Sequence, residues 1–347
     1  MSEPINTVVN GRPAPLKFTA SAWGYTKLWY VNIFLTIITL GIYGPWAKVR
    51  NNQYIYGHSS IEGHSLRYLA DPKRILQGRI LALGVILILW ALGVMFPPAA
   101  IVLPILLFVA SPWLIVQGIR FTLRNTAYRN VRFDFKGSAW DAFVHFILLP
   151  VAAAFTLYLL MPWVFRQIHL FIYRNIEFGG HKVNLETKTG TYYSAAIMTA
   201  LVSLLLYGVV FGIVGALSNG GGLKDPGFII PLVIGFMVVG AIANAMFIAT
   251  IRNHIVNNLE IDRVATFSSD LTVSGYTWLI ITNTLLILVT LGLAFPATHV
   301  RKLAYLSQHT NANLQPGIDH LANTVASNTS AFGEEAAGIL DTDLSII

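Results

Sequence analysis

Residues 32–54 read NIFLTIITLGIYGPWAKVRNNQY, and residues 283–305 read NTLLILVTLGLAFPATHVRKLAY. The two segments share identical residues at identical spacing, namely Asn32, Thr39, Leu40, Gly41, Pro45, Val49, Arg50 and Tyr54 in the first, and Asn283, Thr290, Leu291, Gly292, Pro296, Val300, Arg301 and Tyr305 in the second. Chance does not easily produce such agreement over this length. It indicates an internal repeat, and the glycine and proline in each copy predict a break in a helix.

A third, weaker copy lies between these two, where Pro162-Trp163 echoes Pro45-Trp46. The copies fall near residues 18–68, 133–187 and 267–311. Two further apolar segments separate each copy from the next. An order of repeat, two spans, repeat, two spans, repeat is the kind of internal symmetry that many membrane transporters have.

The composition requires a lipid environment. Of 347 residues, 55% are hydrophobic and only 11% are charged, and the mean hydropathy is +0.62. About 20 apolar residues are needed for a helix to cross a membrane. Seven segments have about that length and polarity, at residues 28–47, 80–96, 99–119, 142–165, 194–217, 228–251 and 277–298.

Composition also argues against other classes of protein. Lys and Arg exceed Asp and Glu by 23 to 16, but no long basic run accompanies this excess, so a nucleic-acid partner is not expected. The chain has no cysteine, which leaves no disulfide, thiol nucleophile or cysteine-bound metal. No cleaved signal peptide is expected before the first apolar segment.

The polar connections predict short β-hairpins. Ser60-Ile61-Glu62, Asn175-Ile176-Glu177 and Asn258-Leu259-Glu260 each follow an apolar segment and precede a turn. An extended stretch comes after each turn, and residues 126–137 have the same form. Short alternating stretches on both sides of a turn are typical of hairpins.

The positions of the basic residues distinguish two possible topologies. If all seven segments cross the membrane, Lys and Arg divide almost evenly between its faces, against the positive-inside rule. If segments 28–47, 142–165 and 277–298 instead dip in and return, every Lys and Arg except Lys224 lies on one face. We therefore state the hypothesis that the three repeated segments are re-entrant or membrane-surface helices and that the other four segments span. Seven ordinary spans are the alternative, because each repeated segment is long enough to cross.

Several of these motifs resemble a known family. Residues 39–50, the following Glu62-Gly63-His64 and the closing pattern at 331–343 resemble the YjgN-like bacterial inner-membrane proteins, a family of unknown function. The likeness covers nearly the whole chain. It implies a multi-pass protein of the bacterial inner membrane, and it implies no activity, substrate or catalytic residue.

Polar residues within apolar segments are the first candidate site, because burying them in a membrane is costly. They are Asn32, Asn283, Thr39, Thr290 and Asn244. An asparagine in apolar surroundings commonly forms a hydrogen bond between helices. The alternative is a polar permeation or ligand-binding path that the repeats line.

Five arginines form the second candidate site. They lie at or near the ends of apolar segments, and they are Arg50, Arg120, Arg166, Arg252 and Arg301. A guanidinium in this position can bind lipid phosphate or a returning carboxylate, or it can extend to the interface as an anchor.

Catalysis and metal binding have little support. His58, Glu62 and His64 lie close in sequence and could take a metal, but the third hairpin has no matching histidine after Glu260. No paired carboxylate, nucleophile elbow, phosphate loop or zinc motif occurs. We expect no metal, no cofactor and no enzymatic activity.

The sequence therefore predicts an all-α integral membrane bundle with internal repeats and short β-hairpins on the cytoplasmic face. Residues 1–305 form the polytopic membrane domain and residues 306–347 a cytoplasmic tail, in which 331–340 is expected to dock as an amphipathic helix on Arg67, Arg132 or Arg263. Membrane lipids are the expected partners, and the oligomeric state stays open. Two functions remain: a transporter-like or lipid-handling protein, or a non-catalytic membrane scaffold or sensor.

The topology can be tested with reporter fusions placed just before residue 28 and just after residue 47. A re-entrant first segment puts both reporters on the same face of the membrane, since the chain enters and leaves on one side. Readings on opposite faces would instead establish an ordinary span.

Overall fold

The computed structural model describes residues 11–96, 99–217 and 226–321 of the chain. Ten short strands form one closed antiparallel barrel, in the order β1-β10-β9-β8-β7-β6-β5-β4-β3-β2. The strands are β1 (Arg12–Phe18), β2 (Ser59–Ile61), β3 (His64–Tyr68), β4 (Thr126–Tyr128), β5 (Val131–Phe135), β6 (Ile176–Phe178), β7 (His181–Leu185), β8 (Leu259–Ile261), β9 (Ala265–Ser269) and β10 (Thr310–Leu314).

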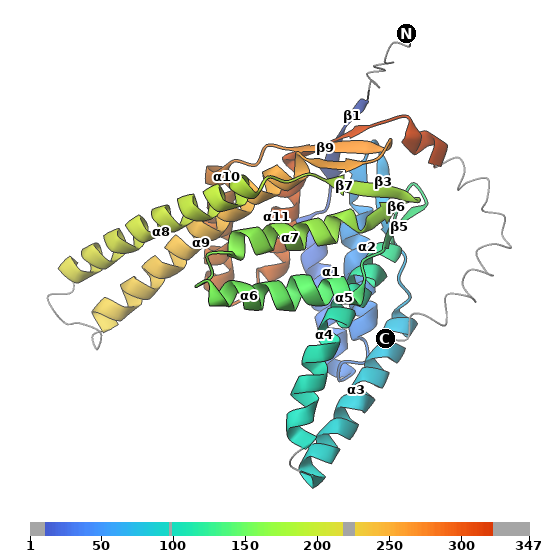
Figure 1. Ribbon diagram of the computed structural model, residues 1–347, viewed down its shortest axis with the longest axis horizontal. Helices are drawn as coiled ribbons and strands as arrows, with labels where there is room; N and C mark the ends of the chain where they lie inside the picture. The colour runs from blue at the N-terminus through green and yellow to red at the C-terminus, as the bar shows by residue number, and fades with distance from the viewer. Residues whose placement is uncertain (1–10, 97–98, 218–225, 322–347) are drawn as a thin grey trace.

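Helical segments connect the strands and extend away from the barrel (Figure 1). A π-helical turn, Val144–Leu148, joins α5 to α6. The helices are α1 (Ala22–Ile38), α2 (Gly44–Gly57), α3 (Pro72–Met95), α4 (Ala99–Arg124), α5 (Ala139–Phe143), α6 (Leu149–Phe155), α7 (Met161–Arg174), α8 (Thr189–Leu217), α9 (Pro226–Val256), α10 (Val273–Val289) and α11 (Phe295–Gln308).

The predicted helices and hairpins are present, but the prediction of an all-α bundle is confirmed only in part, because the hairpins pair with one another into a closed barrel. Two-residue turns join the strands of three hairpins, and both turn residues have positive φ, as in Glu62-Gly63, Arg129-Asn130 and Gly179-Gly180. This backbone matches the right-handed twist of the flanking strands. The remaining pair of adjacent strands, β1 and β10, is not a hairpin, since the two strands come from opposite ends of the described chain.

Closure of the barrel removes exposed strand edges, and apolar side chains fill its interior. Alternate residues contribute to the interior, as Val131 and Phe133 do in β5. The interior cluster contains Ala14, Tyr128, Val131, Phe178, Val183, Ile261, Ala265, Ala312 and Leu314, with Ile318 from the helical turn after β10. The barrel is therefore a packed core and not a channel.

The residues at the start of the predicted tail belong to this barrel. Residues 306–314 form the end of α11 and strand β10, which pairs with both β1 and β9. The backbone N–H of Gln315 donates to the carbonyl of Val264. The predicted helix at 331–340 lies outside the described residues.

Three short helical excursions from the barrel correspond to the three segments that the sequence predicts as repeats. Residues 19–58, 136–175 and 270–309 have equal length, and each begins and ends between paired strands. Phe18 is the Cα partner of Ser59, Phe135 of Ile176, and Ser269 of Thr310. Each excursion therefore returns to the place that it left, as the re-entrant hypothesis requires.

The same turn reverses all three short excursions. Leu40, Leu157 and Leu291 have positive φ at the tip, and the following residue also has positive φ. A threonine precedes each leucine. Thr39 Oγ1 donates to the Leu35 carbonyl and accepts the N–H of Tyr43, at 2.7 and 3.0 Å. Thr290 makes the same two bonds with Leu286 and Ala294, at 2.6 and 3.0 Å.

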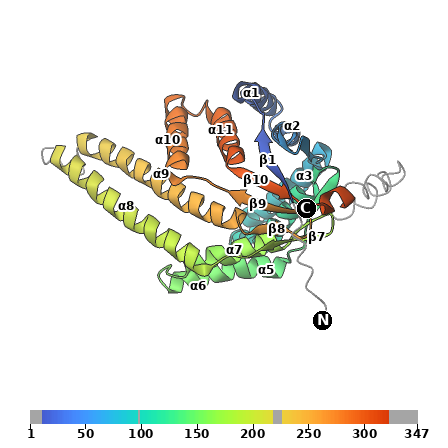
Figure 2. The ribbon, with the colours of Figure 1, turned by 90° about the horizontal axis from the view of Figure 1, so that it is seen from above.

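Two longer excursions form projecting arms. The α3–α4 arm and the α8–α9 arm extend in different directions from the barrel (Figures 1 and 2). Four helices are long and apolar enough to cross a membrane: Pro72–Met95, Pro104–Arg124, Thr189–Leu217 and Gly227–Val256. They correspond to four of the seven predicted segments. Pro97-Pro98 and residues 219–222, predicted as the turns of these arms, lie outside the described residues.

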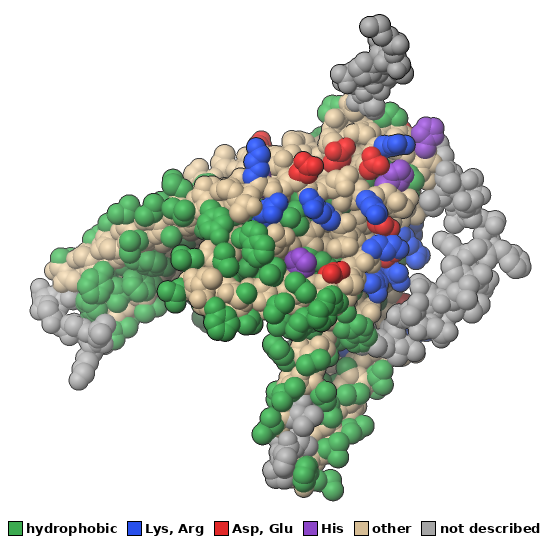
Figure 3. Space-filling view, in the orientation of Figure 1, with side chains coloured by type: hydrophobic (Ala, Val, Ile, Leu, Met, Phe, Trp, Pro, Cys, Tyr) green, Lys and Arg blue, Asp and Glu red, His purple; other side chains and the backbone are tan. Residues whose placement is uncertain are grey.

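Charge and hydrophobicity are separated along the molecule. Figure 3 shows hydrophobic side chains over both arms and charged side chains gathered over the barrel and its junction with the helices. The first and last short excursions pack together, with Trp29 of α1 against Phe295 of α11 at a ring distance of 6.0 Å. Figure 2 shows α11 beside α1.

The threonine turns predict matched losses of stability. Thr39→Val and Thr290→Val each remove a hydroxyl that caps two helices, so each should cost about 1 kcal/mol. In a protein of this size that loss should lower the midpoint of thermal unfolding in detergent by about 2 °C. Thr156→Val should cost less, because Thr156 Oγ1 accepts the N–H of Leu160 at a longer 3.3 Å.

The matched controls are Thr39→Ser and Thr290→Ser, which keep the hydroxyl and should unfold near the wild-type temperature. Valine variants as stable as the serine variants would show that the hydroxyls do not hold these turns.

Candidate functional site

The two asparagines of the first candidate site lie between the paired helices of the short excursions. Asn32 is 1% exposed, and its amide Nδ2 donates to Asn51 Oδ1 of α2 at 2.8 Å. Arg50 Nη1 donates to Asn32 Oδ1 at 3.4 Å and to the Tyr43 hydroxyl at 2.8 Å. These bonds connect α1 to α2 and to the turn between them.

Asn283 has fewer partners than Asn32. Its Nδ2 donates to the Thr298 carbonyl of α11 at 3.4 Å, and its buried Oδ1 has no hydrogen-bond partner among the described residues. Arg301, at the position of Arg50, donates to Thr282 Oγ1 at 3.2 Å instead. The two segments therefore use corresponding positions with different pairings.

The remaining polar residues of the first site do not join the asparagines. Thr39 and Thr290 cap the turns at the tips of the excursions, and Asn244 is exposed on α9. The structure therefore does not bring the five residues into one continuous polar site.

Two of the five arginines each donate hydrogen bonds from two guanidinium nitrogens to acceptors within the protein. Arg120 donates from Nε to the Phe135 carbonyl at 3.1 Å and from Nη2 to the Gly137 carbonyl at 3.2 Å. Arg252 donates from Nη1 to Ser269 Oγ and from Nη2 to Thr310 Oγ1, both at 3.0 Å. These side chains attach the helix before a hairpin to the strand ends that follow it.

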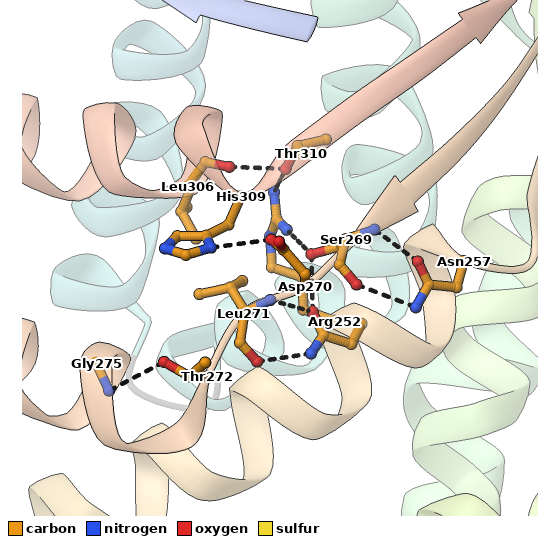
Figure 4. A network of polar contacts seen from close by, with 11 residues as sticks. Arg252, Asn257, Ser269, Asp270, Leu271, Thr272, Gly275, Leu306, His309 and Thr310 are labelled. Carbon is orange, nitrogen blue, oxygen red and sulfur yellow. Dashed lines mark hydrogen bonds and ion pairs between the residues drawn. The ribbon is translucent and has the colours of Figure 1, made fainter. Parts of the chain in front are cut away.

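Figure 4 shows how dense the network around Arg252 is. Asn257 exchanges two hydrogen bonds with the backbone of Ser269, and His309 Nδ1 lies 2.9 Å from Asp270 Oδ1. Asn253 Nδ2 donates to the Leu271 carbonyl at 2.8 Å, while its Oδ1 accepts from Ser269 Oγ and the Leu271 N–H. The network fixes the end of β9 between α9 and α11.

Arg166 differs from Arg120 and Arg252 because, within the described ranges, only one of its nitrogens donates to a protein acceptor. Its Nε donates to the Thr187 carbonyl at 2.9 Å. The next residue, Lys188, donates its backbone N–H to His254 Nε2 of α9 at 3.0 Å. Arg166 and His254 therefore flank two consecutive peptide groups at the start of α8.

Further hydrogen-bonding groups surround this junction. His169 Nδ1 of α7 lies 3.0 Å from the hydroxyl of the fully buried Tyr192 of α8. Thr187 is 7% exposed; its Oγ1 interacts with the Tyr192 hydroxyl but forms no hydrogen bond of good geometry among the described residues. We call Arg166, His169, Thr187, Lys188, Tyr192 and His254 the α7–α8–α9 junction.

A second charged cluster closes the barrel at the helical turn that follows β10. Asp319 accepts from Arg12 Nη2 at 2.7 Å and from Arg129 Nη1 at 2.8 Å. The hydrogen bond from Arg129 and the charge of Arg12 hold the pKa of Asp319 below its ordinary value. Glu62 lies 3.5 Å from Arg12 Nε. This network ties the two ends of the described chain together.

A third cluster stabilises the side of the barrel. Asp134 Oδ1 lies 2.7 Å from Arg124 Nε, and Asp134 Oδ2 lies 2.8 Å from Lys136 Nζ. Burial raises the pKa of Asp134, but the hydrogen bonds from Arg124 and Lys136 outweigh it and lower the pKa to about 2. The stability that these bonds contribute is present above the ordinary pKa and is lost only as pH falls towards 2.

The histidines and Glu62 weighed as a metal site are not arranged as ligands. His58 Nδ1 contacts the Tyr54 carbonyl at 2.7 Å, and Glu62 faces Arg12. In the described part of the chain, no group of three His, Asp or Glu residues is placed to hold a metal ion.

The sequence singles out Arg166 but does not connect it with Lys188 or Tyr192, because the β6–β7 hairpin separates them and no local pattern shows that the chain returns to α7. The Arg12–Asp319 pair was also missed, since no local pattern connects residues at opposite ends of the chain.

Comparison with known proteins identifies the family. A family model described as a bacterial protein of unknown function (DUF898) matches residues 13–339. Inner membrane protein YjgN of Salmonella typhimurium is 25% identical over 363 aligned residues, which cover 89% of this chain and 90% of that protein. Inner membrane protein YjgN of Escherichia coli strain K12 is 22% identical over 340 residues, covering 82% and 85%.

No solved structure matches the chain. The family match covers most of its length, its relatives are named as inner membrane proteins, and four of its helices are long and apolar enough to span. The chain is therefore a multi-pass inner-membrane protein and a member of the DUF898 family of bacterial proteins of unknown function.

Proposed function

We propose that this chain is a lipid-handling protein whose three short excursions insert into the leaflet next to the barrel. The exposed leucines at their tips carry the proposal. Leu40, Leu157 and Leu291 are 94%, 86% and 92% exposed, and all three have the positive φ that branched side chains rarely adopt. An exposed leucine at the end of each excursion fits contact with acyl chains.

The lengths of the helices support partial insertion. Helices α1 and α10 have 17 residues, and α2, α7 and α11 have 14. At about 1.5 Å per residue they extend roughly 21–26 Å, which is less than the roughly 30 Å of the hydrocarbon layer. Their tips would then end inside the bilayer, where Thr39, Thr156 and Thr290 satisfy backbone groups that water cannot reach.

The charge distribution supports a cytoplasmic barrel. All five excursions leave and re-enter between paired strands, so the strands lie together on one side of the membrane. That arrangement puts every Lys and Arg except Lys224 on the barrel side. Positive charge marks the cytoplasmic face of bacterial inner-membrane proteins.

An apolar groove between α9 and α10 offers space for an acyl chain. Its volume is about 610 Å³, and it lies between a spanning helix and a short excursion. The lining includes Ile242, Met246, Val273, Thr277, Trp278 and Ile281. A lipid tail in this groove would be held beside the protein while the headgroup stays at the interface.

We also propose that the three short excursions are copies of one ancestral unit. Their equal lengths, their shared tip geometry and the sequence identities between residues 32–54 and 283–305 support it. The proposed function includes no catalytic step. A transport path at the level of Asn32 and Asn283 has no support, since both side chains are enclosed between paired helices.

Lipid movement between leaflets tests the function. The full chain is reconstituted in vesicles that contain a trace of fluorescent phosphatidylglycerol, and dithionite then bleaches the label that reaches the outer leaflet. Three inserted hairpins disorder one leaflet, so bleaching should proceed beyond the protein-free level. The triple variant Leu40→Ser, Leu157→Ser, Leu291→Ser should return to that level without unfolding, because these side chains pack against little.

The matched control replaces three exposed leucines of the spanning helices, Leu87, Leu107 and Leu204, with serine. It should keep the wild-type rate. If vesicles with the wild-type protein bleach no further than protein-free vesicles, the lipid-handling proposal is wrong. The alternative is then a scaffold or sensor, whose binding module would be the packed barrel with its ion-paired ends.

A further inference from the structure

The α7–α8–α9 junction collects positive charge and hydrogen-bond donors beside the start of a spanning helix. Arg166 has one protein acceptor, for its Nε, and Lys188 is exposed. None of the ion pairs within the described residues includes either side chain. The charged groups that act on His254 are Lys188 and Arg166, both positive.

We propose that this junction binds the phosphate group of an anionic membrane lipid. The inference deepens the proposed function, on which it rests, by naming the class of lipid. A guanidinium with free Nη groups and an ammonium on neighbouring elements are the usual partners of a phosphate, and charge-assisted hydrogen bonds to it are the stronger kind.

A buried hydroxyl provides an independent reason to place a ligand here. Thr187 is 7% exposed, and its Oγ1 forms no hydrogen bond of good geometry among the described residues, although it interacts with the Tyr192 hydroxyl. Leaving a buried hydroxyl unbonded costs free energy, and native structures rarely do so without a bound group or water. The Thr187 carbonyl is already held by Arg166 Nε, so Thr187 and Arg166 are fixed relative to each other.

The position in the membrane fits a headgroup. Helix α8 begins at Thr189 and spans, and β7 of the barrel ends at Leu185. The junction between them therefore lies at the boundary between barrel and bilayer, where lipid phosphates are located. The first turn of α8 adds the positive end of a helix dipole.

Arg120 and Arg252 are less suited to the same role, because each directs two nitrogens to protein acceptors. Arg50 and Arg301, like Arg166, each use one nitrogen among the described residues, with acceptors that include Asn32 of α1 and Thr282 of α10. Arg166 is the one whose acceptor, Thr187, directly precedes the exposed Lys188.

Native mass spectrometry of the full chain, released from a neutral detergent, tests the site by counting bound lipids. Dioleoyl phosphatidylglycerol should bind as one saturable molecule, and more tightly than dioleoyl phosphatidylcholine. In Lys188→Gln the affinity for phosphatidylglycerol should fall about five-fold, the effect of roughly 1 kcal/mol for one lysine at an anionic surface. The lysine side chain is exposed, so the fold should be unaffected.

The matched control is Lys182→Gln, which removes the same charge from an exposed position on β7, near the hairpin turn. It should keep the wild-type affinity. Equal binding of the two lipids, or equal losses in the two variants, would overturn the site. If inorganic phosphate displaces phosphatidylglycerol from the wild type but not from Lys188→Gln, the phosphate site stands and soluble phosphate becomes its alternative source.

The two proposals can fail separately. If the protein does not move lipid between leaflets but binds phosphatidylglycerol in a Lys188-dependent way, the proposed function is wrong and the phosphate site stands. If the protein moves lipid but does not bind phosphatidylglycerol selectively, the phosphate site is wrong and the proposed function stands.

Discussion

The pairing of strand ends on either side of each helical excursion is the constraint on which the rest of the structure depends. Tyr68 pairs with Thr126 and Leu185 with Leu259, just as Phe18 pairs with Ser59 around the first short excursion. A helical segment whose two ends are held a strand's width apart must reverse its direction. The helical hairpins, the exposed tips and the collection of basic residues on one side all follow from that condition.

This constraint also explains why polar groups concentrate where the helices meet the barrel. The outgoing chain after a strand must leave beside the helix that led into the hairpin. Arg120 reaches the Gly137 carbonyl, Arg166 reaches the Thr187 carbonyl and Asn253 reaches the Leu271 carbonyl, so three helices hold the exit of their own hairpin in the same way. Among the described residues Arg166 does so with Nε alone, and for this reason we place the proposed phosphate site beside it.

Much of this architecture could be read from the sequence, for identifiable reasons. Long apolar runs predicted the four spanning helices, and turn residues such as Gly179-Gly180 predicted the hairpins. The closure of the hairpins into a barrel could not be predicted from the sequence. Strand β1 contains Pro13 and Pro15, which cannot donate to a ladder, and its partner β10 is mostly polar. The sequence also offered five equivalent arginines, because nothing local shows which guanidinium finds an acceptor in the folded chain.

The most direct measurement of the central claim is disulfide formation across the strands that flank an excursion. The chain has no cysteine of its own, so introduced pairs give a clean reading. Lys17→Cys with Ser60→Cys and Ser268→Cys with Asn311→Cys join Cα partners on either side of residues 19–58 and 270–309. Mild oxidation in native membranes should cross-link both pairs, seen as a faster band on a non-reducing gel. Cysteines that react with maleimide but do not cross-link in either pair would contradict the account.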